Sequence, residues 1–197
     1  EEAAESYDHA IELMPDEATA HKNMSTVLLL TENFKEGWQE YEWRLRTKDH
    51  GLRTFQQPKW DGSRLEGMPI LVHAEQGFGD TIQFIRYLPM VQMQRGHVIF
   101  ECGKNLHRLL ENCAGINCIV ERMSDNKTSI PFDVHVPLLS LPGILGITLE
   151  TMRSDVPYIT VDSGLVDEWR MRLDRDENFK IGLVWTGNPK FRNRNRS

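Results

Sequence analysis

The sequence predicts an α/β fold with a mostly parallel sheet, preceded by an all-α helical arm. From residue 70 onward, short apolar segments alternate with segments of helical periodicity. Such alternation is typical of parallel strands joined by right-handed helical crossovers. The apolar run at 70–74 is continuous, as expected of a parallel strand covered on both faces. Before residue 50, small and aromatic residues recur at helical intervals instead.

Composition indicates a folded protein that is not a general nucleic-acid binder and has no membrane span. The 197 residues suffice for one domain and a smaller appendage, and 40% of them are apolar. A net charge of −6 argues against a general nucleic-acid binder, and no apolar run approaches the roughly 20 residues of a membrane span. Three cysteines without CxxC spacing are typical of buried thiols, and we expect a cytoplasmic location. Because the chain starts without methionine, we expect a fragment, and a lost leader stays open.

The arm at 1–50 has the spacing of a tetratricopeptide repeat. Its intervals of four, three and five residues match the second half of such a repeat: Ala3, Tyr7, Ala10 and Pro15. One period of about 34 residues later, Gly37 replaces Ala3 and Tyr41 replaces Tyr7. Helices are therefore expected at about 17–31 and 33–47, the second capped by Asn33. Arg44, which stands where Ala10 would recur, departs from the pattern.

Repeats of this kind need neighbours to bury their faces, so we expect further repeats upstream. The aromatic side chains of Trp38, Tyr41 and Trp43 either pack the last helix onto the next domain or bind a peptide. Exposed sides of a truncated array also leave an oligomer open. A connector at 51–69 follows, rich in turn formers, with Trp60 expected to anchor it to a neighbouring surface.

The domain at 70–197 is expected to alternate strands and helices. Asn105 is the predicted cap of its second helix, and Pro89 should kink or divide the first. The predicted strands are 70–74, 97–102, 117–120, 132–136 and 181–186, and the predicted helices are 80–94, 105–112 and 165–173.

The candidate site is the segment that joins the first strand to the first helix. Gly77 and Gly79 allow a sharp turn and a close approach to a ligand, but the spacing is not the GxGxxG of dinucleotide binders. Asp80 is either an N-terminal cap or a general base at a strand end. Glu75 and Gln76 are the more exposed candidates, which either hydrogen-bond a substrate or stabilise the turn.

The scattered histidines do not predict a metal site, because no HxH or HExxH spacing occurs. His73 in the first strand and His135 in the fourth are either core or edge histidines, or they lie near strand ends at a cleft.

The string EQGFGDTIQFIRYLPMV after ILVHA resembles the first strand, loop and helix of heptosyltransferase-like glycosyltransferases with the GT-B fold. The wider sequence resembles bacterial proteins that join tetratricopeptide repeats to such a domain. Their shared phrases look like EGWxxYEWR, EQGxGDxIQFxRY, PLLSLP, PYI and GLVWxGNP. This chain carries them in order at 36–44, 75–87, 137–142, 157–159 and 182–189.

The resemblance implies a role for each matched residue. Asp80 would be the base that activates an acceptor hydroxyl, and Gly77 and Gly79 would shape the acceptor-side loop. Gly187 and Asn188 would line the cleft. The reaction would invert the sugar and need no metal, and the acceptor would be a protein or a glycan that the repeat arm helps to dock.

The resemblance is incomplete at the end of the chain. Phe191 stands where a histidine is expected, and no aspartate follows Asn193. GT-B enzymes bind the nucleotide sugar mainly in a second Rossmann-like half, so we expect this chain to hold only the N-terminal half. By itself it would bind no cofactor and have little transferase activity. The alternative is a non-catalytic repeat module that binds proteins, with a structural α/β domain and Asp80 only a cap.

Overall fold

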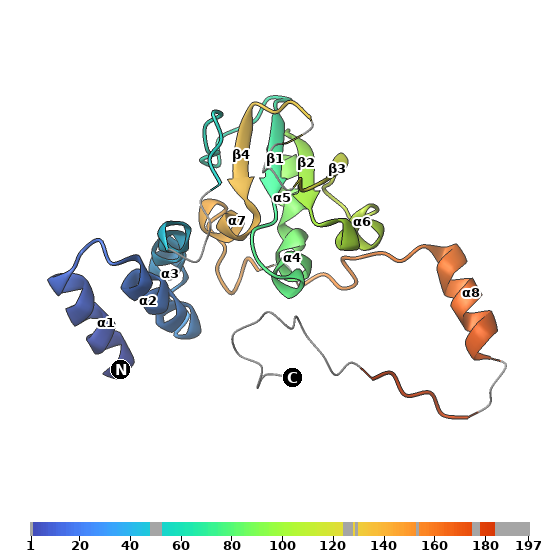
Figure 1. Ribbon diagram of the computed structural model, residues 1–197, viewed down its shortest axis with the longest axis horizontal. Coiled ribbons are helices and arrows are strands. Elements are labelled where there is room, and N and C mark those ends of the chain that lie inside the picture. The colour runs from blue at the N-terminus through green and yellow to red at the C-terminus, as the bar shows by residue number, and fades with distance from the viewer. Residues whose placement is uncertain are drawn as a thin grey trace. The chain divides into compact units, whose positions relative to one another are not determined.

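The computed structural model describes residues 2–47, 53–123, 128, 130–152, 154–174 and 178–183 (Figure 1). Contacts between residues divide the chain into two compact units, Glu1–Thr160 and Val161–Ser197. The first unit holds both the helical arm and the sheet. The predicted boundaries at 50 and 69 inside it stay predictions. No helix in the described part of the chain has the length and apolar character needed to cross a bilayer.

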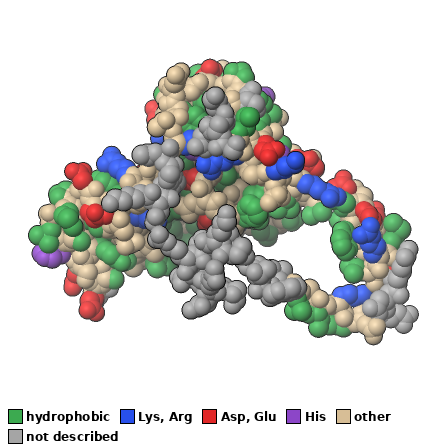
Figure 2. Space-filling model, in the orientation of Figure 1, with side chains coloured by type: hydrophobic (Ala, Val, Ile, Leu, Met, Phe, Trp, Pro, Cys, Tyr) green, Lys and Arg blue, Asp and Glu red, His purple; other side chains and the backbone are tan. Residues whose placement is uncertain are grey.

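The arm consists of successive helices that pack in sequence order: α1 (Glu2–Leu13), α2 (Ala18–Leu30), α3 (Phe34–Tyr41) and a 3-10 helix (Glu42–Arg46). The acidic side chains of α1 are exposed to solvent (Figure 2). Glu17 caps α2 by accepting the Thr19 N–H. Asn33 occupies the N-cap position of α3, but its side chain donates to Glu36 and does not cap the helix, contrary to the prediction.

A glycine brings α2 and α3 close together. A Cβ atom on the buried Gly37 would lie 2.9 Å from side-chain atoms of Leu29. The helical arm is thus observed as two closely packed helices preceded by a third. Its identity as a repeat array stays a prediction.

In the described part of the chain, the sheet has four parallel strands in the order β3-β2-β1-β4, which confirms the α/β class with a parallel sheet (Figure 1). The strands are β1 (Pro69–His73), β2 (His97–Cys102), β3 (Cys118–Glu121) and β4 (Val134–Pro137). In the central register, Ile70 lies opposite both Val98 and Val134. Of the predicted strand 181–186, residues 181–183 are not in a strand and 184–186 lie outside the described residues.

The predicted first helix is divided, as Pro89 suggested. It comprises α4 (Phe78–Phe84), a 3-10 turn (Ile85–Tyr87) and α5 (Leu88–Met93). The next helix, α6 (Lys104–Leu110), begins after Gly103, so the prediction that Asn105 caps it is wrong. Asn105 lies inside the first turn, because the helix begins earlier than its apolar periodicity suggests. The remaining helices are a 3-10 turn (Leu138–Ser140), α7 (Leu141–Ile144) and, in the second unit, α8 (Ser163–Leu173).

The two faces of the sheet have different surroundings. The main core contains Ile70, Val72 and Phe100 together with side chains from α4 to α7. Alternate residues of each strand point to the other face of the sheet, where a smaller cluster includes Leu71, Ile99 and Phe132. The connector runs beside β4, where the Trp60 N–H donates to the His135 carbonyl. Trp60 is only 3% exposed, which confirms its predicted role as an anchor.

Candidate functional site

Asp80 stands in the first turn of α4, directly after the loop that leaves β1. Gly77 is the N-cap residue, and Asp80 Oδ2 accepts the Gly77 N–H at 3.0 Å. The carboxylate therefore satisfies one of the donors that a helix start leaves unpaired. The side chain is half-buried and does not line either of the pockets found in the described part of the chain. This geometry favours the capping interpretation of Asp80, and a role as a base stays a prediction.

The two loop glycines do not need glycine's conformational freedom. Gly77 has φ −71° and ψ 174°, and Gly79 lies in α4 without a positive φ. Glycine allows a sharp turn, but the turn here does not require it, because ordinary residues adopt both conformations. A Cβ atom on Gly79 would meet nothing within 4 Å. The prediction that the backbone at Gly79 lets a ligand approach closely is compatible with this open space and stays a prediction.

Glu75 is buried, although the sequence suggested an exposed side chain. Its side chain is 3% exposed, and its carboxylate accepts from Arg44 of the arm through Nε (3.1 Å) and Nη2 (2.7 Å). The Leu139 N–H also donates to it, at 3.1 Å. Burial of a carboxylate requires such partners, because an unpaired charge in the interior is costly. Glu75 thus ties the loop to the arm, and its predicted contact with substrate stays untested.

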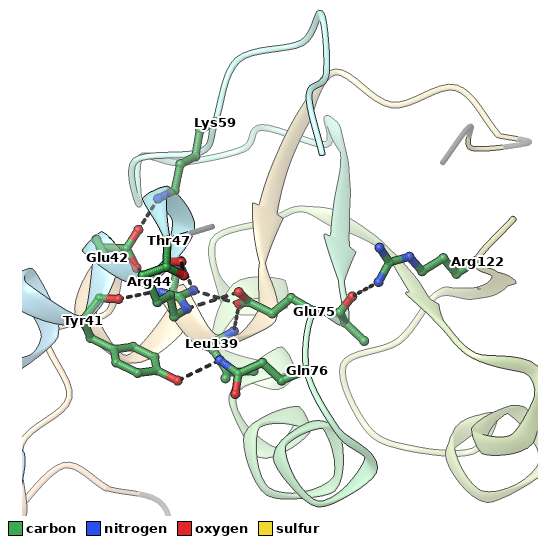
Figure 3. A network of polar contacts seen from close by, with 11 residues as sticks. Tyr41, Glu42, Arg44, Thr47, Lys59, Glu75, Gln76, Arg122 and Leu139 are labelled. Carbon is green, nitrogen blue, oxygen red and sulfur yellow. Dashed lines mark hydrogen bonds and ion pairs between the residues drawn. The ribbon is translucent and has the colours of Figure 1, made fainter. Parts of the chain in front are cut away.

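Arg44 is the centre of this network (Figure 3). Its side chain is 1% exposed, and it also donates to the Tyr41 carbonyl (3.1 Å), Glu42 Oε1 (2.8 Å) and Ser140 Oγ (2.8 Å). The guanidinium stacks on the Tyr41 ring at 4.5 Å from its centroid. Burial lowers the pKa of Arg44, but the carboxylates of Glu75 and Glu42 outweigh it and raise that pKa above its usual value.

Gln76 also contacts the arm. Its Nε2 donates to the Tyr41 hydroxyl at 3.1 Å, and burial raises the pKa of that hydroxyl above its usual value. On the other side of β1's end, Arg122 Nη1 reaches the Ala74 carbonyl at 3.4 Å (Figure 3). The loop is therefore flanked by contacts from three segments that are distant in sequence.

Sequence reasoning did not identify Arg44 as part of the site. The signal that could have found it is its departure from the repeat pattern, where a small residue is replaced by a long cation among aromatic side chains. Its partner lies 31 residues away, and no local pattern predicts that pairing.

The aromatic side chains of the arm divide between two roles. Trp38 donates its indole N–H to the Ile147 carbonyl at 3.2 Å and meets the Phe84 ring edge-on at 6.3 Å. This confirms that Trp38 packs the arm onto the α/β domain. Trp43 instead stacks on His21 inside the arm, with ring centroids 3.8 Å apart.

A pocket of about 720 Å³ lies where the arm, the connector and the α7 region meet. Its walls combine aromatic, aliphatic and charged groups: Lys35, Trp38, Gln39, Glu42, Lys59, Trp60, Asp61, Ser140, Gly143, Ile144, Gly146, Ile147 and Thr148. Glu42 and Ser140 are also partners of Arg44, so the pocket adjoins the buried network.

The predicted histidines lie on the opposite face of the sheet. The rings of His73 and His135 are 5.6 Å apart, and both meet the Phe55 ring. Burial, with Lys59 and Arg53 nearby, lowers the pKa of His135 to about 4. This environment favours the interpretation as core histidines. Nowhere in the described part of the chain do three or more histidine, cysteine or acidic side chains gather in a way that could hold a metal ion.

Two further predictions concern the end of the chain and the cysteines. Gly187 and Asn188 lie outside the described residues. Of the three cysteines expected to be buried thiols, Cys102 and Cys113 are buried and Cys118 is half-buried. Burial raises the pKa of Cys102 to about 12. A thiol with so high a pKa is unreactive at neutral pH.

Comparison with known proteins gives one partial similarity. Protein FlbA of Caulobacter vibrioides is 36% identical over 67 residues, which cover 33% of this chain and 11% of FlbA. No protein-family model matches the chain, and no solved structure matches it. The matching segment is a small part of FlbA, so the similarity does not assign this chain to a family.

Proposed function

We propose that this chain is the N-terminal, acceptor-binding half of a GT-B glycosyltransferase domain, with a tetratricopeptide-repeat arm that docks a protein or glycan acceptor. One observation supports the proposal above others. Three phrases on which the resemblance rests, at 36–44, 75–87 and 137–142, meet in one buried network around Arg44 and Glu75. The matched motifs therefore form the contact between the arm and the sheet domain, as the proposed architecture requires.

In the proposed reaction, Asp80 removes the proton from an acceptor hydroxyl. That oxygen attacks the anomeric carbon of a nucleotide sugar, the bond to the diphosphate breaks, and the configuration at the sugar inverts. Asp80 Oδ2 holds the Gly77 N–H, and Oδ1 would accept the proton. The donor would bind mainly to a second half outside this chain, the leaving diphosphate would be stabilised without a metal, and the enzyme would act in the cytoplasm.

The test is Asp80→Asn in a longer protein that includes the residues after Ser197. Asparagine keeps an acceptor for the Gly77 N–H, so the free energy of unfolding should stay close to that of the unchanged protein. Loss of the base should lower the transfer rate on the order of 100-fold or more. The assay follows release of nucleoside diphosphate from a panel of nucleotide sugars, and a chain ending at Ser197 should release none. An unchanged rate in Asp80→Asn would exclude Asp80 as the base.

The second candidate function is a non-catalytic interaction module, which the engaged carboxylates of Asp80 and Glu75 favour. In that case the longer protein shows no transfer with any donor, and Asp80→Ala costs only about 1 kcal/mol of stability. Pulling down an acceptor with the arm alone would not separate the two, because both functions use the arm.

A further inference from the structure

The segment 76–79, which leads from β1 into the first turn of α4 and so to Asp80, has little packing of its own. Gln76, Gly77, Phe78 and Gly79 are all exposed, and Phe78 is 54% exposed. An exposed segment with few buried contacts opens locally at low free-energy cost. Its conformation therefore depends on whatever holds its two ends.

One end of the loop is held from the arm. Glu75 lies two residues before Gly77, and its carboxylate is fixed at three points: two N–H groups of Arg44 and the Leu139 N–H. Both charged side chains are almost completely buried. We propose that Arg44 is a positioning residue, which sets the conformation of the loop at 75–79, and with it the place of Asp80, from the helical arm.

The geometry of Arg44 suits this role better than a simple charge would. All three of its nitrogens donate hydrogen bonds. Nε and Nη2 donate to the Glu75 carboxylate, and Nη2 also donates to Ser140 Oγ. Nη1 donates to the Tyr41 carbonyl and to Glu42. A planar fork of this kind fixes direction as well as distance. A lysine at this position would keep the charge and lose the direction.

The arm side of this contact is itself firmly placed. Trp38 is bonded to the Ile147 carbonyl, and a Cβ atom on Gly143 would lie 3.1 Å from the Trp38 Cβ. Tyr41, on the same helix, supplies the second contact to the loop through Gln76. The arm is thus held against the segment 143–147 by contacts that do not involve the loop, and Arg44 and Tyr41 connect it to the loop. This inference does not depend on the proposed function, since it concerns loop conformation and not transfer.

The experiment measures amide hydrogen exchange in a double variant, Arg44→Met with Glu75→Gln, which leaves no buried charge unpaired. The Gly77 N–H bonds to Asp80, and the Thr81 N–H bonds to the Gly77 carbonyl. Both amides should exchange on the order of tenfold faster than in the unchanged chain. The amides of Val98 and Phe100 in β2 should not change.

The matched control is a second buried ion pair, Arg53 with Glu101, on the opposite face of the sheet. The double variant Arg53→Met with Glu101→Gln makes the same chemical change and should leave the Gly77 and Thr81 amides as they are. Equal acceleration in both double variants, or none in the first, would overturn the proposal. If the Arg44→Met, Glu75→Gln protein fails to fold, Arg44→Lys decides, because it keeps the charge and should still accelerate exchange at Gly77.

Discussion

Side chains in the loop after β1 and in the first turn of α4 make structural contacts within the protein. Asp80 Oδ2 holds the Gly77 N–H, Glu75 is gripped by Arg44, and Gln76 contacts Tyr41. Each of these contacts fixes a side chain that a catalytic loop would have to present in one orientation. A structural contact and a functional role are compatible here, because an orienting partner is what a base or a substrate-binding group requires.

Gly79 offers a test that separates fold from function. Because a Cβ atom there would meet nothing within 4 Å and the residue is helical, Gly79→Ala should raise the free energy of unfolding by about 0.5–1 kcal/mol. If a substrate approaches this backbone closely, the same variant of the longer protein should lose acceptor affinity. Urea unfolding and an acceptor titration measure the two effects.

Gly103→Ala is the control for Gly79→Ala, since Gly103, the N-cap residue of α6, likewise has open space where a Cβ atom would lie. It should leave acceptor affinity unchanged. Unaltered affinity in Gly79→Ala would remove Gly79 from the binding site.

His135 should make the stability depend on pH. Its pKa is lowered from 6.5 to about 4, so the folded protein binds fewer protons than the unfolded chain between these values. The free energy of unfolding should therefore fall as the pH is lowered from about 6.5 to 4, by up to about 3 kcal/mol from this residue. His135→Gln should flatten that part of the curve, measured by urea unfolding at several pH values.

The exposed His97 provides the control for His135, because His97→Gln removes a histidine without removing a buried one. Its curve should follow that of the unchanged chain. Parallel curves for His135→Gln and the unchanged chain would show that the buried imidazole is not the cause.

At the scale of elements, local sequence patterns predicted most strand positions and the break in the first helix of the α/β domain. Strand β2 lies where its apolar run predicts it, β1 and β3 lie within a residue or two, and the helix break comes next to Pro89. These features depend on periodicity and on the chemistry of proline, which are local. The prediction that Asn105 caps α6 was wrong because several residues near a helix start can occupy the N-cap position. In this protein Gly103 occupies it.

Gly37 decides how closely α2 and α3 approach. A larger side chain would press on Leu29, so Gly37→Val should lower the free energy of unfolding by about 1–3 kcal/mol. Gln39→Val, at an exposed position of the same helix, carries only the propensity cost of a β-branched residue and should change stability by about 0.5 kcal/mol. Denaturation followed by circular dichroism measures both. Equal losses would mean that helix propensity, and not close packing, explains the effect.

At the scale of the whole chain, the junction between arm and sheet was beyond local prediction. The Trp38 contact to Ile147 spans 109 residues, and the Arg44 contact to Ser140 spans 96. Such pairings depend on the complete fold, so the sequence predicts that aromatic side chains pack somewhere but not which partner they meet. Gly187 and Asn188 lie outside the described residues, so their predicted places in a cleft stay predictions.

The arm should depend on this junction for its stability. No residue of α1 is buried, and α2 buries only a few side chains, so the arm has little core of its own in the described part of the chain. Small helical units of this kind gain their stability from a neighbouring surface. Trp38→Ala removes the main aromatic contact to the sheet domain, and losses of about 3 kcal/mol are typical for such a truncation.

In Trp38→Ala, amide exchange in α2 should therefore become faster by on the order of 100-fold, while the β2 amides keep more of their protection. In the unchanged chain, the intact Trp38 contact should keep the α2 amides protected, because the arm and the sheet lie in one compact unit. Trp169→Ala, which removes a 56% exposed indole from α8 in the other unit, is the control and should alter neither. If the sheet loses as much protection as the arm in Trp38→Ala, the two form one cooperative unit. The prediction that the arm depends on the sheet more than the sheet depends on the arm would then be wrong.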